Sequence, residues 1–485
     1  INMGGEFYPM EIAIHTLRAV AYAIADPSNA FILIMIALIF YNKNKKIAAM
    51  QKMIMGESLD SPFELTISQI VIGIFAGAAA SLIFTYAGLV FDENSNIYLL
   101  FMVSLFFMAF KPRFICFSYS GAILGIASLL FKYAANTLNM PQLDVINIDI
   151  LTLMTLVGIL HIVEGSLVMI DGSRGAIPVF TNRDNKIVGG FALKRYWALP
   201  IALLILLSAT SSNLVVGQSV MIPEWRHLIK GDIIDRIVKN SVIASIALYG
   251  VIGYSGITFT KSKRAKTLTS GALIMVYGLA LTAVAQLAVL GTAYQFFILI
   301  FAAVVHEAML RLEKHMEFTM KPKFSSSDEG IMVLAVAPKS PAFQMGIESG
   351  DLIVELNGKA IEAEEEIFNI IKGNFSSLSL KIKKPFGDLK NVNYSNVASN
   401  KRLGIVIVPR EIPKDTAIVN MNDETFKEVI DKIKNKDKDK DEDKNEDEDK
   451  DIKQEEDQKQ EQEQEQEQEQ EQEQEQEQEQ EQDKK

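Results

Sequence analysis

The hydrophobic pattern divides the chain into a long apolar part, a shorter alternating part and a polar tail. Residues 1–311 contain repeated runs of about 17–25 mostly apolar residues, which is the length that crosses a lipid bilayer as a helix. We therefore predict an α-helical polytopic membrane domain with about nine spans. The runs lie near residues 24–41, 65–91, 97–110, 114–135, 148–170, 198–216, 241–260, 270–290 and 294–311.

Small residues indicate where the predicted helices approach each other. Gly73 and Gly77 form a GxxxG pattern in the second span, and Gly250, Gly253 and Gly256 form a glycine face in the seventh. Because glycine lets two helix backbones come close together, we expect helix–helix contacts at both places.

The pattern changes after a linker at 312–323. Short alternating runs over 324–412 predict a small β-barrel or sandwich with two helices. The dipeptide Asn357-Gly358 predicts a hairpin turn. The expected elements are strands at 330–336, 350–361 and 378–383, a short helix after Pro338 and an amphipathic helix at 363–372.

The order of motifs in this part resembles a PDZ domain. Ser340-Pro341-Ala342 is followed by Gly346, by Gly350-Asp351-Leu352-Ile353 and by Asn357-Gly358. The resemblance implies the bacterial arrangement of the fold, in which the run from Arg402 to Ile407 supplies the carboxylate-binding loop and a strand beside which a peptide can add. The implied peptide-binding residues are Arg402, Leu403, Gly404, Ile405, Ile407, Ile367 and Ile371. The alternative is that residues 403–408 close the sheet without a ligand.

The acidity of the chain lies in its tail. The formal net charge is −12, but residues 431–485 alone carry 26 acidic and 11 basic side chains, so residues 1–430 have a net charge of +3. The tail ends in a Glu-Gln alternation without an apolar stripe, so we expect residues 413–485 to be disordered. This charge distribution argues against a nucleic-acid-binding protein.

The chain has one cysteine, Cys116, inside an apolar run. A single cysteine excludes a disulfide scaffold. We interpret Cys116 as a small buried hydrophobic residue.

Few ionisable residues interrupt the apolar runs: His161 and Glu164 in the fifth, and His306 and Glu307 in the ninth. Such groups are costly in a bilayer and therefore mark candidate functional sites. A membrane zinc protease needs two histidines at i and i+4, and Leu310 stands where the second would follow His306. We therefore expect polar pairs that fix helix packing, with no catalytic residue, no metal and no cofactor.

The basic residues of the loops predict the orientation. With the N-terminus outside, fifteen lysines and arginines lie in cytoplasmic loops and six on the other side, four of those six in the segment 217–239. An odd number of spans then places the PDZ-like part and the tail in the cytoplasm.

The region around the fifth run resembles the MinJ family of low-GC Gram-positive bacteria. The motifs that carry this resemblance are Lys43-Asn44-Lys45-Lys46, His161 to Gly165, Asp171 to Phe180, Val188 to Phe191 and Arg195-Tyr196-Trp197. The resemblance covers roughly residues 10–412 and departs from the family pattern at Ala198-Leu199-Pro200. It implies a non-enzymatic scaffold in the cell membrane, enriched at septum and poles, that links a DivIVA-like marker to the division inhibitors MinC and MinD.

A membrane protease, or a PDZ protein that regulates one, is the alternative function. The residues argue against the protease because the zinc motif is broken at Leu310 and no separate Gly-x-Ser-x-Gly elbow is present. A transporter would need repeated halves, and the sequence shows no such internal symmetry.

The charge asymmetry of the loops yields a topology prediction. Alkaline phosphatase fused after residue 322 should be inactive in cells, because the enzyme folds only outside the cytoplasm. An active fusion would reverse the orientation and place the PDZ-like part on the outer face.

Overall fold

The computed structural model describes residues 9–410, except 56–58, 93–94, 111–115, 141, 143–145, 185, 209–240, 362–363, 373–376 and 396–401. The tail, expected to be disordered, and the basic segment 217–239 lie outside the described residues.

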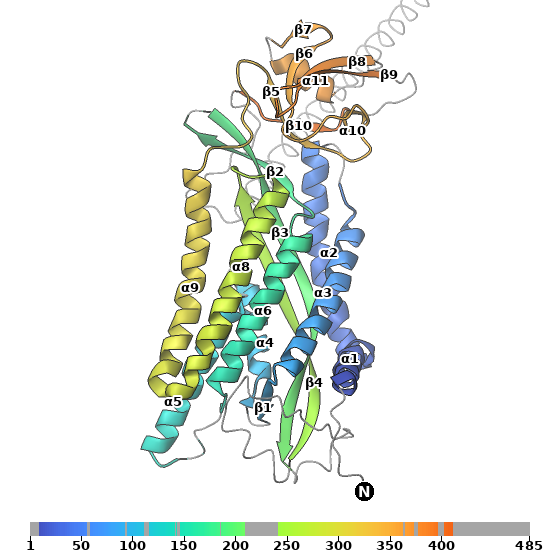
Figure 1. Ribbon diagram of the computed structural model, residues 1–485. Coiled ribbons are helices and arrows are strands. Elements are labelled where there is room, and N and C mark those ends of the chain that lie inside the picture. Colours follow the sequence, from blue (N-terminus) through green and yellow to red (C-terminus); the bar gives the residue numbers. More distant parts are fainter. Residues whose placement is uncertain are drawn as a thin grey trace, which may run out of the picture. The chain divides into compact units, whose positions relative to one another are not determined.

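The N-terminal part consists mainly of helices (Figure 1). Five of the described helices are long and apolar enough to cross a membrane, and a sixth span results if α1 and α2, which meet at an angle of 70°, count as one. Nine helical spans are not confirmed. The helices are α1 (Pro9–Ala25), α2 (Pro27–Met55), α3 (Pro62–Tyr86), α4 (Tyr98–Phe110), α5 (Phe117–Thr137), α6 (Ile150–Asp171), α8 (Lys263–Ala285) and α9 (Thr292–Thr319).

Two of the predicted helical spans are wrong, because the described residues of 198–216 and 241–260 are strands. Strand β3 (Lys186–Ser208) pairs antiparallel with β4 (Ser241–Thr258) from Phe191↔Thr258 to Ser208↔Ser241. An apolar run of this kind does not distinguish helix from strand by periodicity. The physical reason lies in composition: β4 is rich in valine, isoleucine and glycine, and β3 contains Pro200, all unfavourable inside a helix.

Two shorter strands complete this sheet. Strand β2 (Ile177–Arg183) pairs antiparallel with the beginning of β3, and β1 (Val90–Asp92) pairs parallel with its end. Residues 171–197, which contain several of the motifs quoted from the sequence, therefore include a hairpin whose turn lies at Asp184, a residue with φ of 54°.

The GxxxG pattern of α3 packs against a strand instead of a helix. A Cβ atom on Gly73 would lie 2.2 Å from the carbonyl oxygen of Ala198, and one on Gly77 would lie 2.3 Å from that of Pro200. One turn further along α3, Ser81 Oγ accepts the backbone N–H of Ala202 at 2.9 Å. The predicted close approach is therefore present, but its partner is β3.

Helices α6 and α8 approach each other closely and run side by side in Figure 1. A Cβ atom on Gly165 would lie 2.5 Å from the carbonyl oxygen of Gly271, and one on Gly278 would lie 2.6 Å from that of Gly158. Side chains at these positions would force the two helices apart.

A buried ion pair joins the end of α6 to β3. The Asp171 carboxylate accepts hydrogen bonds from Arg195 Nε at 3.0 Å and from Trp197 Nε1 at 2.9 Å. The same guanidinium donates to Ser68 Oγ on α3 at 2.8 Å. The side chains of Asp171 and Arg195 are 4% and 1% exposed, so the two charges depend on each other for solvation.

The C-terminal part of the described chain is a six-stranded β-domain with strand order β10-β5-β6-β8-β9, in which β7 pairs with β6. The predicted strands, the short helix, the amphipathic helix and the Asn357-Gly358 turn are confirmed; both turn residues have positive φ. Strand β9 was not predicted. The elements are β5 (Ile331–Val336), α10 (Pro341–Gln344), β6 (Leu352–Leu356), β7 (Lys359–Ala360), α11 (Glu364–Lys372), β8 (Ser377–Lys383), β9 (Leu389–Ser395) and β10 (Ile405–Ile407).

The glycine pair at the start of β3 allows close contacts on both sides. The Gly189 N–H donates to the carbonyl oxygen of Phe324, and a Cβ on Gly189 would lie 2.7 Å from Val408 Cγ2. A Cβ on Gly190 would lie 2.3 Å from the Thr258 carbonyl oxygen of β4. The hairpin thus packs against the β-domain at Gly189 and against β4 at Gly190, and a side chain at either position would displace its neighbours.

The buried ion pair yields a stability prediction. Asp171→Asn should lower the free energy of unfolding by about 3–5 kcal/mol, because it leaves the Arg195 charge buried without a counter-charge. Thermal unfolding of the purified protein in detergent measures the loss. Asp184→Asn is the control, since the Asp184 side chain is 92% exposed and its loss should cost no more than about 0.5 kcal/mol. Equal midpoints for the two variants would contradict the assigned role of Asp171.

Candidate functional site

The first candidate site is the edge of the β-domain formed by β10. Strand β10 stands at one end of the sheet and pairs antiparallel with β5 on its inner side. The backbone just before it is tied to the chain around α10: the Ala337 N–H donates to Gly404 O at 2.8 Å, and the Ala342 N–H donates to Leu403 O at 3.1 Å. Gly404 has φ of 73°. A left-handed residue at the start of an edge strand is the backbone geometry that can turn successive N–H groups toward an anion.

The side chains predicted to bind a peptide separate into two groups. The buried side chains Leu403, Ile405, Ile407 and Ile367 belong to the hydrophobic core of the β-domain, each at most 3% exposed. Ile371 is half-buried against that core and Arg402 is exposed. Strand β10 and α11 therefore share one hydrophobic core, and of the named side chains only Arg402 and Ile371 remain accessible.

Gly404 serves the packing of the β-domain. A Cβ atom at this position would lie 2.3 Å from Ser340 Cβ, on the residue that caps α10. Ser340 also donates a hydrogen bond to Ala337 O at 2.7 Å. Any side chain at position 404 therefore perturbs the loop itself, so substitution there does not isolate an effect on a ligand.

The Gly350-Asp351 motif has a structural role. Asp351 is fully buried and its carboxylate accepts hydrogen bonds from the Glu348 N–H at 2.8 Å and from Lys384 Nζ at 3.0 Å. Burial acts to lower the pKa of Lys384, but its hydrogen bonds to Asp351 and Glu348 outweigh this and raise the pKa overall. The motif therefore ties the loop before β6 to the end of β8.

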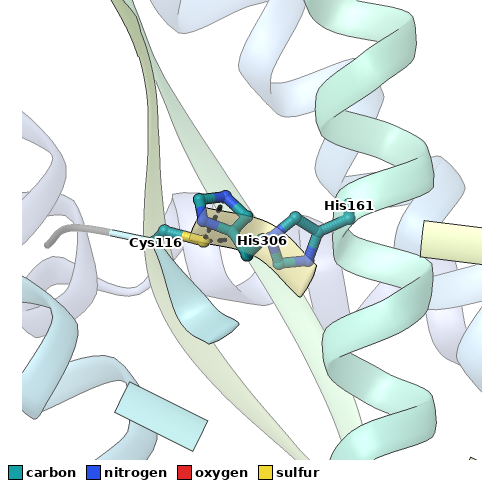
Figure 2. A group of neighbouring side chains, drawn as sticks. All are labelled: Cys116, His161 and His306. Atoms are coloured by element: carbon teal, nitrogen blue, oxygen red, sulfur yellow. Dashed lines mark hydrogen bonds between the residues drawn. The ribbon is translucent and has the colours of Figure 1, made fainter. Parts of the chain in front are cut away.

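The second candidate site lies within the helices, where Cys116, His161 and His306 meet (Figure 2). Cys116 Sγ lies 3.0 Å from His161 Nε2 and 3.2 Å from His306 Nε2. The three residues come from the N-terminal end of α5, the middle of α6 and the middle of α9. The two polar pairs expected from the sequence thus form one cluster, and the interpretation of Cys116 as only a small hydrophobic residue misses its two histidine neighbours.

The two glutamates of the expected pairs lie beside the cluster. Glu164 Oε2 is 3.9 Å from His161 Nε2. Glu307 accepts a hydrogen bond from Tyr119 OH at 3.1 Å and pairs with Arg311 at 3.2 Å. In the sequence, the one indication of this cluster is that two histidines and one cysteine occur in separate apolar runs.

Comparison with known proteins supports the β-domain assignment. Residues 332–384 match the PDZ domain family. A protein of Lacticaseibacillus paracasei named probable cell division topological determinant MinJ is 24% identical over 86 residues, which is 18% of this chain and 23% of that protein. Serine protease HTRA3 of Rattus norvegicus is 37% identical over 71 residues, or 15% of each chain. The chain spans less than a quarter of the length of these relatives. The structure therefore contains a PDZ domain, a module that binds peptides of partner proteins.

The crowding at Gly404 yields a stability prediction with a matched control. Gly404→Ala and Gly346→Ala both place a side chain at a positive φ, 73° and 74°, but only the Cβ at 404 meets another residue. The strain of a left-handed alanine, about 1–2 kcal/mol, is common to both variants. Gly404→Ala should therefore destabilise the PDZ domain more, by roughly a further 1–3 kcal/mol from overpacking. Hydrogen exchange of β5 and β10 in the full chain measures the difference, and equal exchange would refute the steric role.

Proposed function

We propose that this protein is a non-enzymatic membrane scaffold whose PDZ domain binds an extended segment of a partner protein along β10. The observation that carries the proposal is the position of β10 at the end of the sheet, beginning at the left-handed residue Gly404. An extended peptide can add there as a further strand and form main-chain hydrogen bonds with the outer edge of β10.

The helix α11 supplies the second side of the proposed binding region. Glu364, at the first turn of α11, accepts the backbone N–H of Arg410 just after β10. This contact brings the start of the helix to the end of the strand. Phe368 and Ile371, half-buried further along α11, are then the apolar side chains that a peptide residue would meet.

Arg402 favours a peptide that ends in a carboxylate. The side chain is exposed and lies two residues before Gly404, where the N–H groups of the loop would receive an anion. A solvated positive charge at this distance contributes up to about 1 kcal/mol. The partner segment is therefore a chain terminus, with an internal extended segment as the weaker ligand.

The helical part anchors the domain in the lipid bilayer. Five to six spans formed by the described helices have the required length and hydropathy, which supports this proposal. Arg183, in the basic segment 174–195, donates to the carbonyl oxygen of Met320 just after α9, which supports a PDZ domain on the basic, cytoplasmic side. Only the eleven residues 320–330 separate the end of helix α9 at Thr319 from the start of β5 at Ile331. So short a connection keeps the PDZ domain close to the membrane surface.

The partners belong to the division machinery. The similarity to a protein of Lacticaseibacillus paracasei named as a probable cell division topological determinant supports a role in cell division. The location at septum and poles and the recruitment of a DivIVA-like marker and a MinD-like division inhibitor are what the resemblance of the sequence motifs to the MinJ family implies. The similarity to HTRA3 is confined to about 70 residues of PDZ sequence, so it does not argue for proteolysis.

A charge reversal at the proposed carboxylate end tests the function. Arg402→Glu should reduce recovery of the DivIVA-like and MinD-like proteins by about 5- to 10-fold in pull-downs and weaken septal enrichment of a fluorescent fusion, because the introduced carboxylate repels the ligand. Lys390→Glu is the control: Lys390 is an exposed residue of β9, at the opposite end of the sheet, and the change in net charge is the same. Equal recovery with both variants would show that recruitment does not use the β10 edge.

A further inference from the structure

We propose that Cys116, His161 and His306 form a binding site for a transition-metal ion of the Zn²⁺ class. Their donor atoms, one sulfur and two ring nitrogens, all lie within 4.8 Å of one another. Thiolate sulfur and imidazole nitrogen are the donors that Zn²⁺ prefers, and oxygen-seeking ions such as Mg²⁺ and Ca²⁺ do not select them. This proposal replaces the expectation from the sequence that the chain holds no metal.

Both histidines present the same nitrogen to the sulfur. His161 Nδ1 lies 2.7 Å from the Val157 carbonyl oxygen, which can only accept, so Nδ1 carries the proton and Nε2 holds a lone pair. His306 Nδ1 lies 3.3 Å from Tyr119 OH, and Tyr119 donates its own proton to the Glu307 carboxylate. His306 therefore also carries its proton on Nδ1. A metal-bound histidine commonly donates its second nitrogen to a carbonyl or other oxygen in this way.

A count of protons around Cys116 leaves one lone pair without a donor. A thiol has one hydrogen, which can satisfy His161 Nε2 at 3.0 Å or His306 Nε2 at 3.2 Å, but not both. Both histidines are buried, at 0% and 5% exposure.

The neighbouring hydroxyl groups do not supply the missing hydrogen. Tyr277 OH donates to Ala302 O at 2.8 Å, so the 2.7 Å contact between Ser118 and Tyr277 uses the hydrogen of Ser118. Ser118 Oγ lies 3.1 Å from His161 Nε2. Because its hydrogen is already used, it directs a lone pair at that nitrogen. A cation placed between these lone pairs satisfies all of them at once.

The two sulfur–nitrogen distances are close to those of a tetrahedral zinc site, and the two ring nitrogens, within 4.8 Å of each other, would come to about 3.3 Å around the ion. With Zn–S of about 2.3 Å and Zn–N of about 2.0–2.1 Å, sulfur and nitrogen are about 3.5 Å apart around the ion. The observed 3.0 and 3.2 Å have to widen by a few tenths of an ångström. Ser118 Oγ, 3.1 Å from His161 Nε2, is the neighbouring oxygen nearest to a fourth ligand.

The backbone favours a negatively charged sulfur at this place. Cys116 is the N-cap residue of α5 and its Sγ accepts the Ser118 N–H at 3.4 Å. The N-terminus of a helix of 21 residues carries partial positive charge. A thiolate ligand therefore has a local counter-charge in addition to the metal.

The bound ion would connect three helices. One ligand comes from α5, one from α6 and one from α9, and α9 is the helix that leads into the PDZ domain. Occupancy of the site therefore stabilises the arrangement from which the PDZ domain extends.

The test uses the full-length protein purified in detergent, loaded with Zn²⁺ and then freed of excess metal. We expect about one zinc per chain by elemental analysis, and a thiolate-to-cobalt charge-transfer band after loading with Co²⁺. Cys116→Ser, His161→Ala and His306→Ala should each weaken zinc affinity at least about 100-fold, since loss of only a supporting hydrogen bond already costs 10- to 100-fold. Tyr119→Phe, which removes the acceptor for His306 Nδ1, should weaken it about 10-fold.

His315→Ala is the matched control, because His315 is an exposed histidine on the same helix as His306. It should bind zinc like the unchanged protein. Cys116→Ser and Tyr119→Phe keep the test decisive if a histidine variant does not fold. Zinc content that is absent, or that is equal in Cys116→Ser and His315→Ala, overturns the proposal. So does a Cys116 thiol that is alkylated equally fast with and without Zn²⁺, which would indicate a nucleophilic cysteine activated by histidine instead.

Discussion

The backbone of β3 needs hydrogen-bond partners along its whole length in apolar surroundings, and much of the N-terminal part is arranged to supply them. Strand β4 pairs with it over eighteen residues from Phe191 to Ser208, and β2 and β1 pair with its two ends. Between these ends, α3 approaches so closely at Gly73 that no side chain fits, and Ser81 accepts the Ala202 N–H. An unpaired peptide group in this environment would cost several kcal/mol.

A buried ion pair connects the sequence motifs that contain Asp171, Arg195 and Trp197. Asp171 ends α6, and Arg195 and Trp197 lie on β3, so the three residues are far apart in sequence but share one carboxylate. The arginine reaches on to α3 through Ser68. A single buried ion pair therefore joins the sheet to two helices, and its removal affects all three.

Local rules predict the PDZ domain well and the N-terminal part only partly. The turn at Asn357-Gly358, the cap at Ser340 and the alternation of β8 each act within a few residues, so the sequence contains their whole signal. The strands β3 and β4 are apolar throughout, and whether these segments form strands or helices depends on partners from other parts of the chain. The sequence shows that they are buried but not in which secondary structure.

The candidate sites differ in the same way. The strand at 405–407 follows from a local motif, although burial of Ile405 and Ile407 shows that the motif serves the core as well as the strand edge. Cys116 lies 45 residues from His161 and 190 from His306. No spacing rule relates residues so far apart, and only the folded chain brings them together.

Recognition at the β10 edge is the central claim, and site-specific crosslinking in dividing cells tests it most directly. A photo-reactive amino acid at position 402 should form an adduct with a DivIVA-like or MinD-like protein, attached through the terminal or extended segment of that partner. The same group at position 390, on the opposite edge of the sheet, should form none. Equal crosslinking from both positions, or adducts with these proteins from 390 alone, would contradict the account.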